Sequence, residues 1–183
     1  MAKNNWYAIF SHTGSEIINI QKMLKIKPTE IWTSNRDYAG NLPAIFGDRY
    51  SIESRMLEVA TGSVITLNGY RRLISSQTLR ILKDKGIKVI NIHPAPICLN
   101  GYEDLRGIDP HVKYYNGYVA GKYTLLGVTI HEVDDGIDTG KALYMSTKLA
   151  STGMDYDMFV NELHNMGTEA WIACLPELLD MEV

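Results

Sequence analysis

Short apolar runs alternate along the first half of the chain with segments whose apolar residues recur at helical spacing. The runs have the length of buried strands and cover residues 6–10, 30–34, 64–67 and 87–91. A helix is predicted after the first run, from Ile17 onward, and another over residues 75–84, where a serine can cap its start and Gly86 ends it. Strands that alternate with helices in this way indicate a mostly parallel sheet that is covered on both faces.

The second half of the chain has a different pattern. Residues 124–133 and 141–148 are predicted to be two strands joined by a turn, which would add an antiparallel extension to the sheet. Beyond them, residues 154–166 and 168–179 are amphipathic and are predicted to be two helices separated at Gly167. Three shorter segments complete the prediction: a short helix at 42–46, a connecting segment at 56–61 and a short helix at 110–116.

These elements predict the α/β class, with a Rossmann-like, mostly parallel sheet flanked by helices and an antiparallel extension near the C-terminal half. The 183 residues are enough for one domain with its own core, so we expect a single domain over 1–183. Ligands on such sheets bind at the carboxyl ends of the strands. We therefore expect the functional residues to lie at the carboxyl ends of the parallel strands.

Composition narrows the possible functions. The content of 45% apolar and 21% charged residues is typical of a globular protein, and a formal charge of −3 with scattered Lys and Arg disfavours nucleic acid as a partner. Cys98 and Cys174 have no His at ligand spacing, so no metal site is expected. No apolar run is long enough for a bilayer and the first residues lead directly into a strand, so the sequence predicts neither a membrane span nor a signal peptide, and a cytoplasmic location.

The segment Asn91-Ile92-His93-Pro94 closes the fourth apolar run. Asn91 and His93 are two residues apart at the end of a strand, so their side chains should leave the same face of the sheet. Together with a carboxylate such as Asp138, they would supply the groups that move an acyl group to an amine. The residues alone also fit a strand that ends at a proline and an ordinary aspartate in a turn.

The order of three segments resembles the folate-dependent formyltransferase family, whose members include glycinamide ribonucleotide formyltransferase. The first is Asn91-Ile92-His93-Pro94, the second is His131-Glu-Val-Asp-Asp-Gly-Ile-Asp138-Thr-Gly140, and the third, Leu67 to Ile74, is similar to the folate-cleft segment of the family. The resemblance extends from Phe10 to about Leu149.

The resemblance implies a formyl transfer from 10-formyltetrahydrofolate to an amine, without a metal, by the catalytic residues Asn91, His93 and Asp138. Asp134 and Asp135 compete for the carboxylate role, but the spacing from His131 favours Asp138. His131 itself is expected to be structural. The residues implied to hold the folate are Arg72, Leu73, Ile74, Asp134, Asp135 and Gly136.

The acceptor amine is less well defined by the sequence. Thr13, Gly14 and Ser15 resemble a loop that binds the substrate phosphate in ribonucleotide enzymes, although Glu16 follows where the family usually has asparagine. We therefore predict that Thr13, Gly14, Ser15 and Glu16 bind the substrate and that glycinamide ribonucleotide is the first acceptor, which would place the chain in purine biosynthesis.

Other readings of the sequence stay open. The acceptor could be an amino sugar nucleotide, which segments around Arg106 and Met166 favour, whereas the short C-terminus disfavours tRNA. The chain could also be a 10-formyltetrahydrofolate hydrolase or a non-catalytic folate-binding protein. A homo-oligomer is compatible with the sequence, which does not define the oligomeric state.

Overall fold

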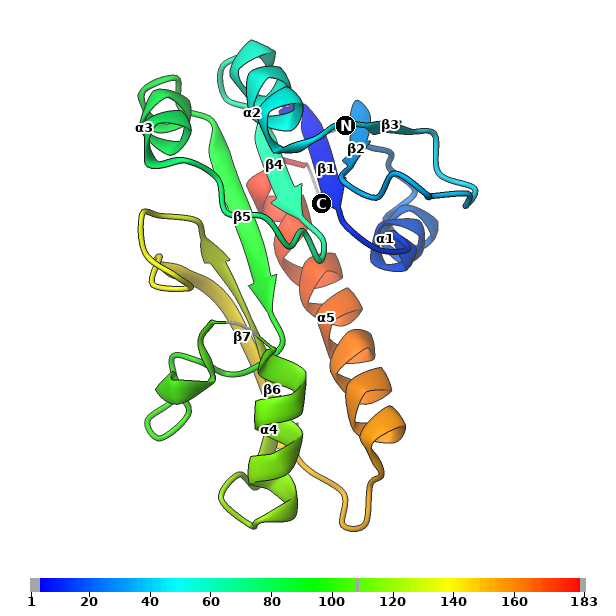
Figure 1. Cartoon of the computed structure of the whole chain (residues 1–183), viewed down its shortest axis with the longest axis vertical. Helices are drawn as coiled ribbons and strands as arrows, with labels where there is room; N and C mark the ends of the chain where they lie inside the picture. The colour runs from blue at the N-terminus through cyan, green and yellow to red at the C-terminus, as the bar shows by residue number, and fades with distance from the viewer. Residues whose placement is uncertain (1–3, 108, 182–183) are drawn as a thin grey trace.

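We analysed a computed structural model of the chain, which describes residues 4–107 and 109–181. The other positions of the predicted domain lie outside the described residues. A seven-stranded sheet with the order β3-β2-β1-β4-β5-β6-β7 forms its centre (Figure 1). The strands are β1 (Trp6–Phe10), β2 (Glu30–Thr33), β3 (Ala44–Phe46), β4 (Val64–Leu67), β5 (Lys88–His93), β6 (Leu125–Glu132) and β7 (Ala142–Leu149).

The sheet is parallel from β3 to β5 and antiparallel from β5 to β7. This arrangement confirms the predicted α/β class and its antiparallel extension. The helices are α1 (Ser15–Leu24), α2 (Arg49–Glu58), α3 (Ser76–Asp84), α4 (Pro110–Val119) and α5 (Tyr156–Leu178), with a 3-10 turn at Glu103–Leu105. None of the described helices is long and apolar enough to cross a membrane.

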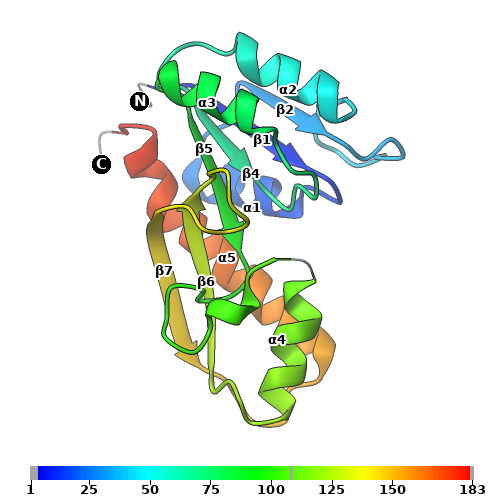
Figure 2. The same ribbon diagram turned by 60° about the vertical axis from the view of Figure 1, so that its left-hand side comes forward.

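Two apolar clusters lie on opposite faces of the sheet. One includes Ile90 and residues of α1, α4 and α5, and the other includes Val89 and residues of α2 and α3. Figure 2 shows α2 and α3 on one side of the parallel strands and α1 and α5 on the other. Successive residues of β5 therefore point to different helical layers, as the alternation of a strand requires.

The predicted short helix at 42–46 is wrong, because Ala44–Phe46 is the edge strand β3 and pairs in parallel with Ile31–Thr33. The backbone groups of these residues are bonded to the neighbouring strand β2 instead of to one another, as a helix would require. The connecting segment at 56–61 is also wrong in part. Its first residues belong to α2, which starts at an Asp48 cap that accepts a hydrogen bond from the Ser51 amide at 2.8 Å.

The predicted break at Gly167 is wrong as well, because α5 continues through it from Tyr156 to Leu178. A Cβ atom at Gly167 would lie 3.1 Å from Oε1 of Glu16 and 3.3 Å from Cδ1 of Ile92. The glycine thus permits close approach of α5 to α1 and β5 instead of ending the helix.

Candidate active site

The end of β5 carries the two polar residues that the sequence singled out. Asn91 and His93 point to the α2 and α3 side of the sheet, since Ile90 and Ile92 pack on the opposite side. In the antiparallel register, Asn91 faces His131 of β6 and His93 faces Thr129. The site therefore forms where the parallel part of the sheet meets its antiparallel extension.

Asp138 reaches this position from the turn between β6 and β7. Its Oδ2 atom lies 3.1 Å from Nδ1 of His93 and accepts a hydrogen bond from the Gly107 amide at 2.9 Å. Its backbone has φ of 54°, in the left-handed region, and this helps to turn the chain back over the sheet. The structure thus brings Asn91, His93 and Asp138 together.

His131 contacts two members of this group. Its Nε2 atom lies 3.4 Å from Nδ2 of Asn91 and 3.5 Å from Oδ1 of Asp138, and its Nδ1 atom lies 2.9 Å from the carbonyl oxygen of Glu132. Sequence reasoning gave His131 only a structural role. A correct prediction of the antiparallel pairing between β5 and β6 would have placed His131 in the site, because His131 lies directly opposite Asn91 in that pairing.

The charge of Asp138 is stabilised by these neighbours. Burial would raise the pKa of Asp138, but hydrogen bonds from His131 and His93, the charge of His93 and the Gly107 amide together hold the pKa well below its usual range. His93 is only 3% exposed, and its Nε2 atom lies 2.8 Å from the carbonyl oxygen of Leu105. Both ring nitrogens of His93 therefore face hydrogen-bond acceptors, which a ring protonated on both nitrogens would satisfy.

A third, partly buried histidine lies near His93. His111 of α4 packs edge to face on His164 of α5, with 5.6 Å between the ring centroids. Burial, and then the charges of His164, His93 and Arg71, lower the pKa of His111 to about 4. Its buried Nε2 atom has no hydrogen-bond partner among the described residues. His111 is therefore neutral at neutral pH.

The residues predicted to hold folate are divided between different surroundings. Asp134 and Asp135 line a cavity of about 460 Å³ whose apolar lining includes Leu79, Val89 and Val133. Gly136 does not line this cavity, and its amide donates to Oδ1 of Asp134 at 3.1 Å within the turn. The lining also includes four cationic residues, Arg80, Lys83, Lys88 and Lys141, so the cavity combines apolar walls with charges of both signs.

The predicted segment 72–74 lies outside that cavity. Leu73 is 67% exposed, and Ile74 packs against the apolar cluster under α2 and α3. Arg72 lines a different cavity, near the carboxyl ends of β1, β2 and β4.

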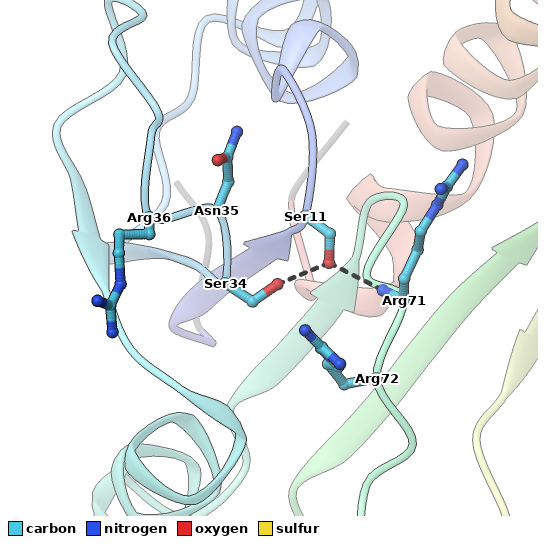
Figure 3. Close-up of a pocket in the computed structure, with 6 residues that line it drawn as sticks. All are labelled: Ser11, Ser34, Asn35, Arg36, Arg71 and Arg72. Atoms are coloured by element: carbon cyan, nitrogen blue, oxygen red, sulfur yellow. Dashed lines mark hydrogen bonds between the residues drawn. The ribbon is translucent and has the colours of Figure 1, made fainter.

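That other cavity has a volume of about 360 Å³ and a polar lining (Figure 3). We call it the arginine cavity, and it is lined by Ser11, Ser34, Asn35, Arg36, Arg71 and Arg72. The four residues predicted to bind the substrate, Thr13 to Glu16, are not part of its lining.

The predicted substrate loop instead forms the start of α1. Gly14 is the N-cap residue with φ of 65°, and the hydroxyl of Thr13 donates to Oγ of Ser15 at 3.1 Å. The carboxylate of Glu16 points inward, where it accepts hydrogen bonds from Nδ2 of Asn68 at 2.7 Å and Nε1 of Trp171 at 3.0 Å. Burial raises the pKa of Glu16 to about 7, although both hydrogen bonds act in the opposite direction.

No group of three or more His, Cys, Asp or Glu side chains that could hold a metal ion occurs in the part of the chain that the structure describes.

Residues 51–175 match the family model for formyl transferases, and this range includes Asn91, His93 and Asp138. The chain belongs to the formyl transferase family. The matched range covers more than half of the chain and contains both the site and the 460 Å³ cavity. This formyl transferase is accordingly an enzyme of formyl-group transfer.

Solved structures with the same fold cover nearly all of this formyl transferase. A glycinamide ribonucleotide transformylase from Geobacillus kaustophilus has 23% identity and a TM-score of 0.76, over 96% of this chain and 98% of its own. Phosphoribosylglycinamide formyltransferases from Campylobacter jejuni (18% identity, TM-score 0.76, 97% and 99% covered) and Streptococcus pneumoniae (20%, 0.74, 96% and 98%) are also similar. At these identities the likeness shows the fold.

Proposed function

We propose that this formyl transferase moves the formyl group of 10-formyltetrahydrofolate to a primary amine of a phosphorylated small molecule. The observation that carries the proposal is the contact of His93 Nδ1 with Asp138 Oδ2 at 3.1 Å, on the strand that also presents Asn91. The family membership and the 460 Å³ cavity beside Val89, two residues before Asn91, support folate as the donor.

Asn91 is proposed to stabilise the oxygen of the reacting formyl group. When the amine attacks the formyl carbon, negative charge develops on that oxygen, and the side-chain amide of Asn91 can donate a hydrogen bond to it. A single donor of this kind contributes about 10²–10³ in rate. Asn91 is partly exposed, so a ligand can reach it from the carboxyl end of β5.

His93, oriented by Asp138, is proposed to transfer protons between the attacking amine and the leaving N10 of the folate. The attacking amine must lose a proton, and N10 of the folate must gain one when it leaves. The Asp138 carboxylate fixes the orientation of the His93 ring through its contact with Nδ1. Because Nε2 of His93 contacts the Leu105 carbonyl, a proton transfer through Nε2 requires that contact to open.

Glycinamide ribonucleotide is the first acceptor to test, since the similar structures from Geobacillus kaustophilus and Campylobacter jejuni are enzymes named for that substrate. An amino sugar nucleotide is the second candidate. The arginine cavity favours it, because three guanidinium groups in one cavity suit a diphosphate as well as a single phosphate.

The proposal is tested by incubating the protein with 10-formyltetrahydrofolate and separate acceptors: glycinamide ribonucleotide, its unphosphorylated riboside, an amino sugar nucleotide and no amine. Tetrahydrofolate formation and the acceptor mass are followed. We expect a mass increase of one formyl group on a phosphorylated acceptor and very little on the riboside.

Two outcomes would contradict formyl transfer to an amine. Release of formate at the same rate with and without amine would indicate a hydrolase. Folate binding without turnover on any acceptor would indicate a binding protein.

A further inference from the structure

The lining of the arginine cavity does not include Thr13 to Glu16, which the sequence predicted to bind the substrate phosphate, although Ser11 of the lining is only two residues before Thr13. Its six lining side chains comprise two hydroxyls, one carboxamide and three guanidinium groups, and no carboxylate. Figure 3 shows the Arg72 side chain directed toward Ser34, whereas the Arg36 and Arg71 side chains lie on opposite flanks and extend away from the two serines. The Arg36 guanidinium lies over the Phe46 ring, 5.4 Å from its centroid. In a chain whose formal charge is −3, this is a local concentration of positive charge.

The cavity is held in shape by hydrogen bonds that do not consume its charges. Ser11 Oγ lies 2.8 Å from Ser34 Oγ and accepts from the Arg71 amide at 2.9 Å, which ties together the ends of β1, β2 and β4. Asn35 is fixed by its side-chain amide, which donates to the His12 carbonyl at 3.1 Å. Among residues 4–107 and 109–181, no carboxylate pairs with the three guanidinium groups.

The strand register places this cavity in line with the reaction centre. Ile9 pairs with Trp32 on one side and Leu67 on the other, and Leu67 pairs with Asn91. Two residues further along the chain come Ser34, Ser11 and Gly69, which follow β2, β1 and β4, and His93, which ends β5. The Ser11 amide donates to the Gly69 carbonyl at 3.3 Å, which keeps these two segments together at the carboxyl edge. Neighbouring strands are about 4.8 Å apart, so Ser11 and His93 are separated by about 10 Å.

Gly69 leaves the path between them open. It has φ of 73°, and a Cβ atom built on it would meet nothing within 4 Å. A ligand that crosses Gly69 can thus have one end at the arginine cavity and the other beside Asn91 and His93.

We propose that the arginine cavity binds the phosphoryl-bearing end of the amine acceptor, in place of the first turn of α1. This inference rests on the proposed function. Planar guanidinium groups bind phosphoryl oxygens in pairs, and the serine and asparagine side chains add neutral donors. The first turn of α1 is less suitable, because the Thr13 hydroxyl already lies 3.4 Å from the Ser15 amide. The Glu16 carboxylate is turned inward to Asn68 and Trp171 and does not itself oppose an anion there.

The test measures binding without turnover. Inorganic phosphate and pyrophosphate are titrated into the full-length protein by calorimetry, and the Arg36→Gln/Arg71→Gln variant is compared with Lys22→Gln/Lys27→Gln, which removes two exposed charges elsewhere. For whichever of phosphate and pyrophosphate binds the wild type more tightly, we expect the dissociation constant to rise at least tenfold in Arg36→Gln/Arg71→Gln. In the control, Lys22→Gln/Lys27→Gln, it should stay within twofold of the wild-type value. Equal affinities in both variants would overturn the inference.

Comparison of the two probes identifies the acceptor class: tighter pyrophosphate supports a diphosphate, and tighter phosphate supports a monophosphate. Circular dichroism checks that the double variant is folded, and if it is not, Arg36→Gln and Arg71→Gln are measured singly, each with an expected loss of at least threefold. Single variants that bind like the wild type would count against the cavity.

Carboxylates of a folate glutamate tail are another anion that the cavity could take. Tri-γ-glutamate is therefore titrated as a third probe. Tighter binding of this peptide than of either phosphate, lost in the same arginine variant, would overturn the acceptor assignment.

Failure of this inference can be told apart from failure of the proposed function. If formyl transfer occurs and the acceptor KM is unchanged in the arginine variant, only the cavity assignment is wrong. If pyrophosphate binds in the cavity but no amine is formylated, only the proposed function is wrong.

Discussion

Two carboxylates, Asp138 and Glu16, are enclosed on opposite faces of the same sheet, and their surroundings act on them in opposite directions. Burial would raise the pKa of both groups. Asp138 receives hydrogen bonds from two imidazole rings and an amide, and its pKa is lowered. Glu16 receives hydrogen bonds only from the neutral side chains of Asn68 and Trp171, and its pKa is raised to about 7.

The difference teaches that the charge of the donors and the depth of burial decide the outcome together, since Glu16 is also the more deeply buried of the two. Donors that can carry a positive charge outweigh the cost of removing a carboxylate from water, whereas neutral donors do not. Asp138 is thus kept as an anion for the proposed reaction, and Glu16 takes up a proton near neutral pH. Changes to each carboxylate should accordingly affect different properties of the protein.

The largest effect is expected for Asp138→Asn. The asparagine keeps the shape of the side chain but removes the charge that orients and stabilises the His93 ring. General acid–base groups contribute about 10²–10⁴ in rate, so we expect kcat for formyl transfer to fall by a factor in that range. The measurement is tetrahydrofolate formation with the best acceptor of the panel.

Asp84→Asn is the matched control, since Asp84 is exposed at the end of α3. Folate binding should be retained in both variants. Wild-type turnover in Asp138→Asn would show that the carboxylate is not part of the catalytic group.

A smaller effect, on stability, is expected for Glu16→Gln. The folded-state pKa of about 7 exceeds the ordinary value of 4.5, so the folded protein holds more protons between these pH values and the wild type loses stability as pH rises through them. One pKa unit corresponds to about 1.4 kcal/mol, which gives a loss of up to about 3 kcal/mol. Glutamine mimics the protonated acid and should remove this slope.

Urea unfolding of Glu16→Gln and wild type at pH 4.5, 6 and 8 measures the effect. The two proteins should be similar at the lowest pH, and the variant should be more stable at the highest. Glu169→Gln, at an exposed position of α5, is the control. Parallel slopes for Glu16→Gln and wild type would mean that Glu16 is ionised throughout.

The smallest effect is expected for Thr66→Val, which disturbs the neutral donors of Glu16 indirectly. Thr66 Oγ1 accepts from Trp6 Nε1 at 2.9 Å and donates to Oδ1 of Asn68 at 2.8 Å, so it orients the amide that binds Glu16. Loss of these bonds should lower the free energy of unfolding by about 1–2 kcal/mol. A weaker donor should also extend the pH-dependent loss of stability to higher pH.

Thermal unfolding at pH 6 and pH 8 measures both effects, with the exposed Thr61→Val as control. If the Thr66→Val variant has wild-type stability at both pH values, the hydrogen bonds of Thr66 do not contribute to the stability of the packing between α1, α5 and the sheet.

The sequence predicted the fold well where its patterns were long. Apolar runs such as 64–67 and 87–91 could only be strands in that alternation, and β4 and β5 lie there. The prediction of a helix break at Gly167 was wrong, because the sequence does not distinguish a glycine that allows close helix packing from a glycine that ends a helix. It also missed the start of α2, whose cap at Asp48 is followed by few apolar residues.

The site was predicted in part. Asn91 and His93 followed from strand alternation, whereas Asp138 depended on the resemblance to a family, since its place beside His93 requires a turn that folds back over the sheet. Neither the contact of His131 with Asp138 nor the inward position of Glu16 could be deduced, because both depend on tertiary packing. The residue roles themselves stay predictions until activity is measured.

The left-handed backbone at Asp138, with φ of 54°, limits which sequences can carry this site. Asparagine and glycine tolerate that backbone but have no charge, and glutamate has the charge but places it one methylene further from the chain. Aspartate alone meets both requirements. The turn between β6 and β7 therefore depends at this position on a short side chain that carries a charge and accepts a left-handed backbone.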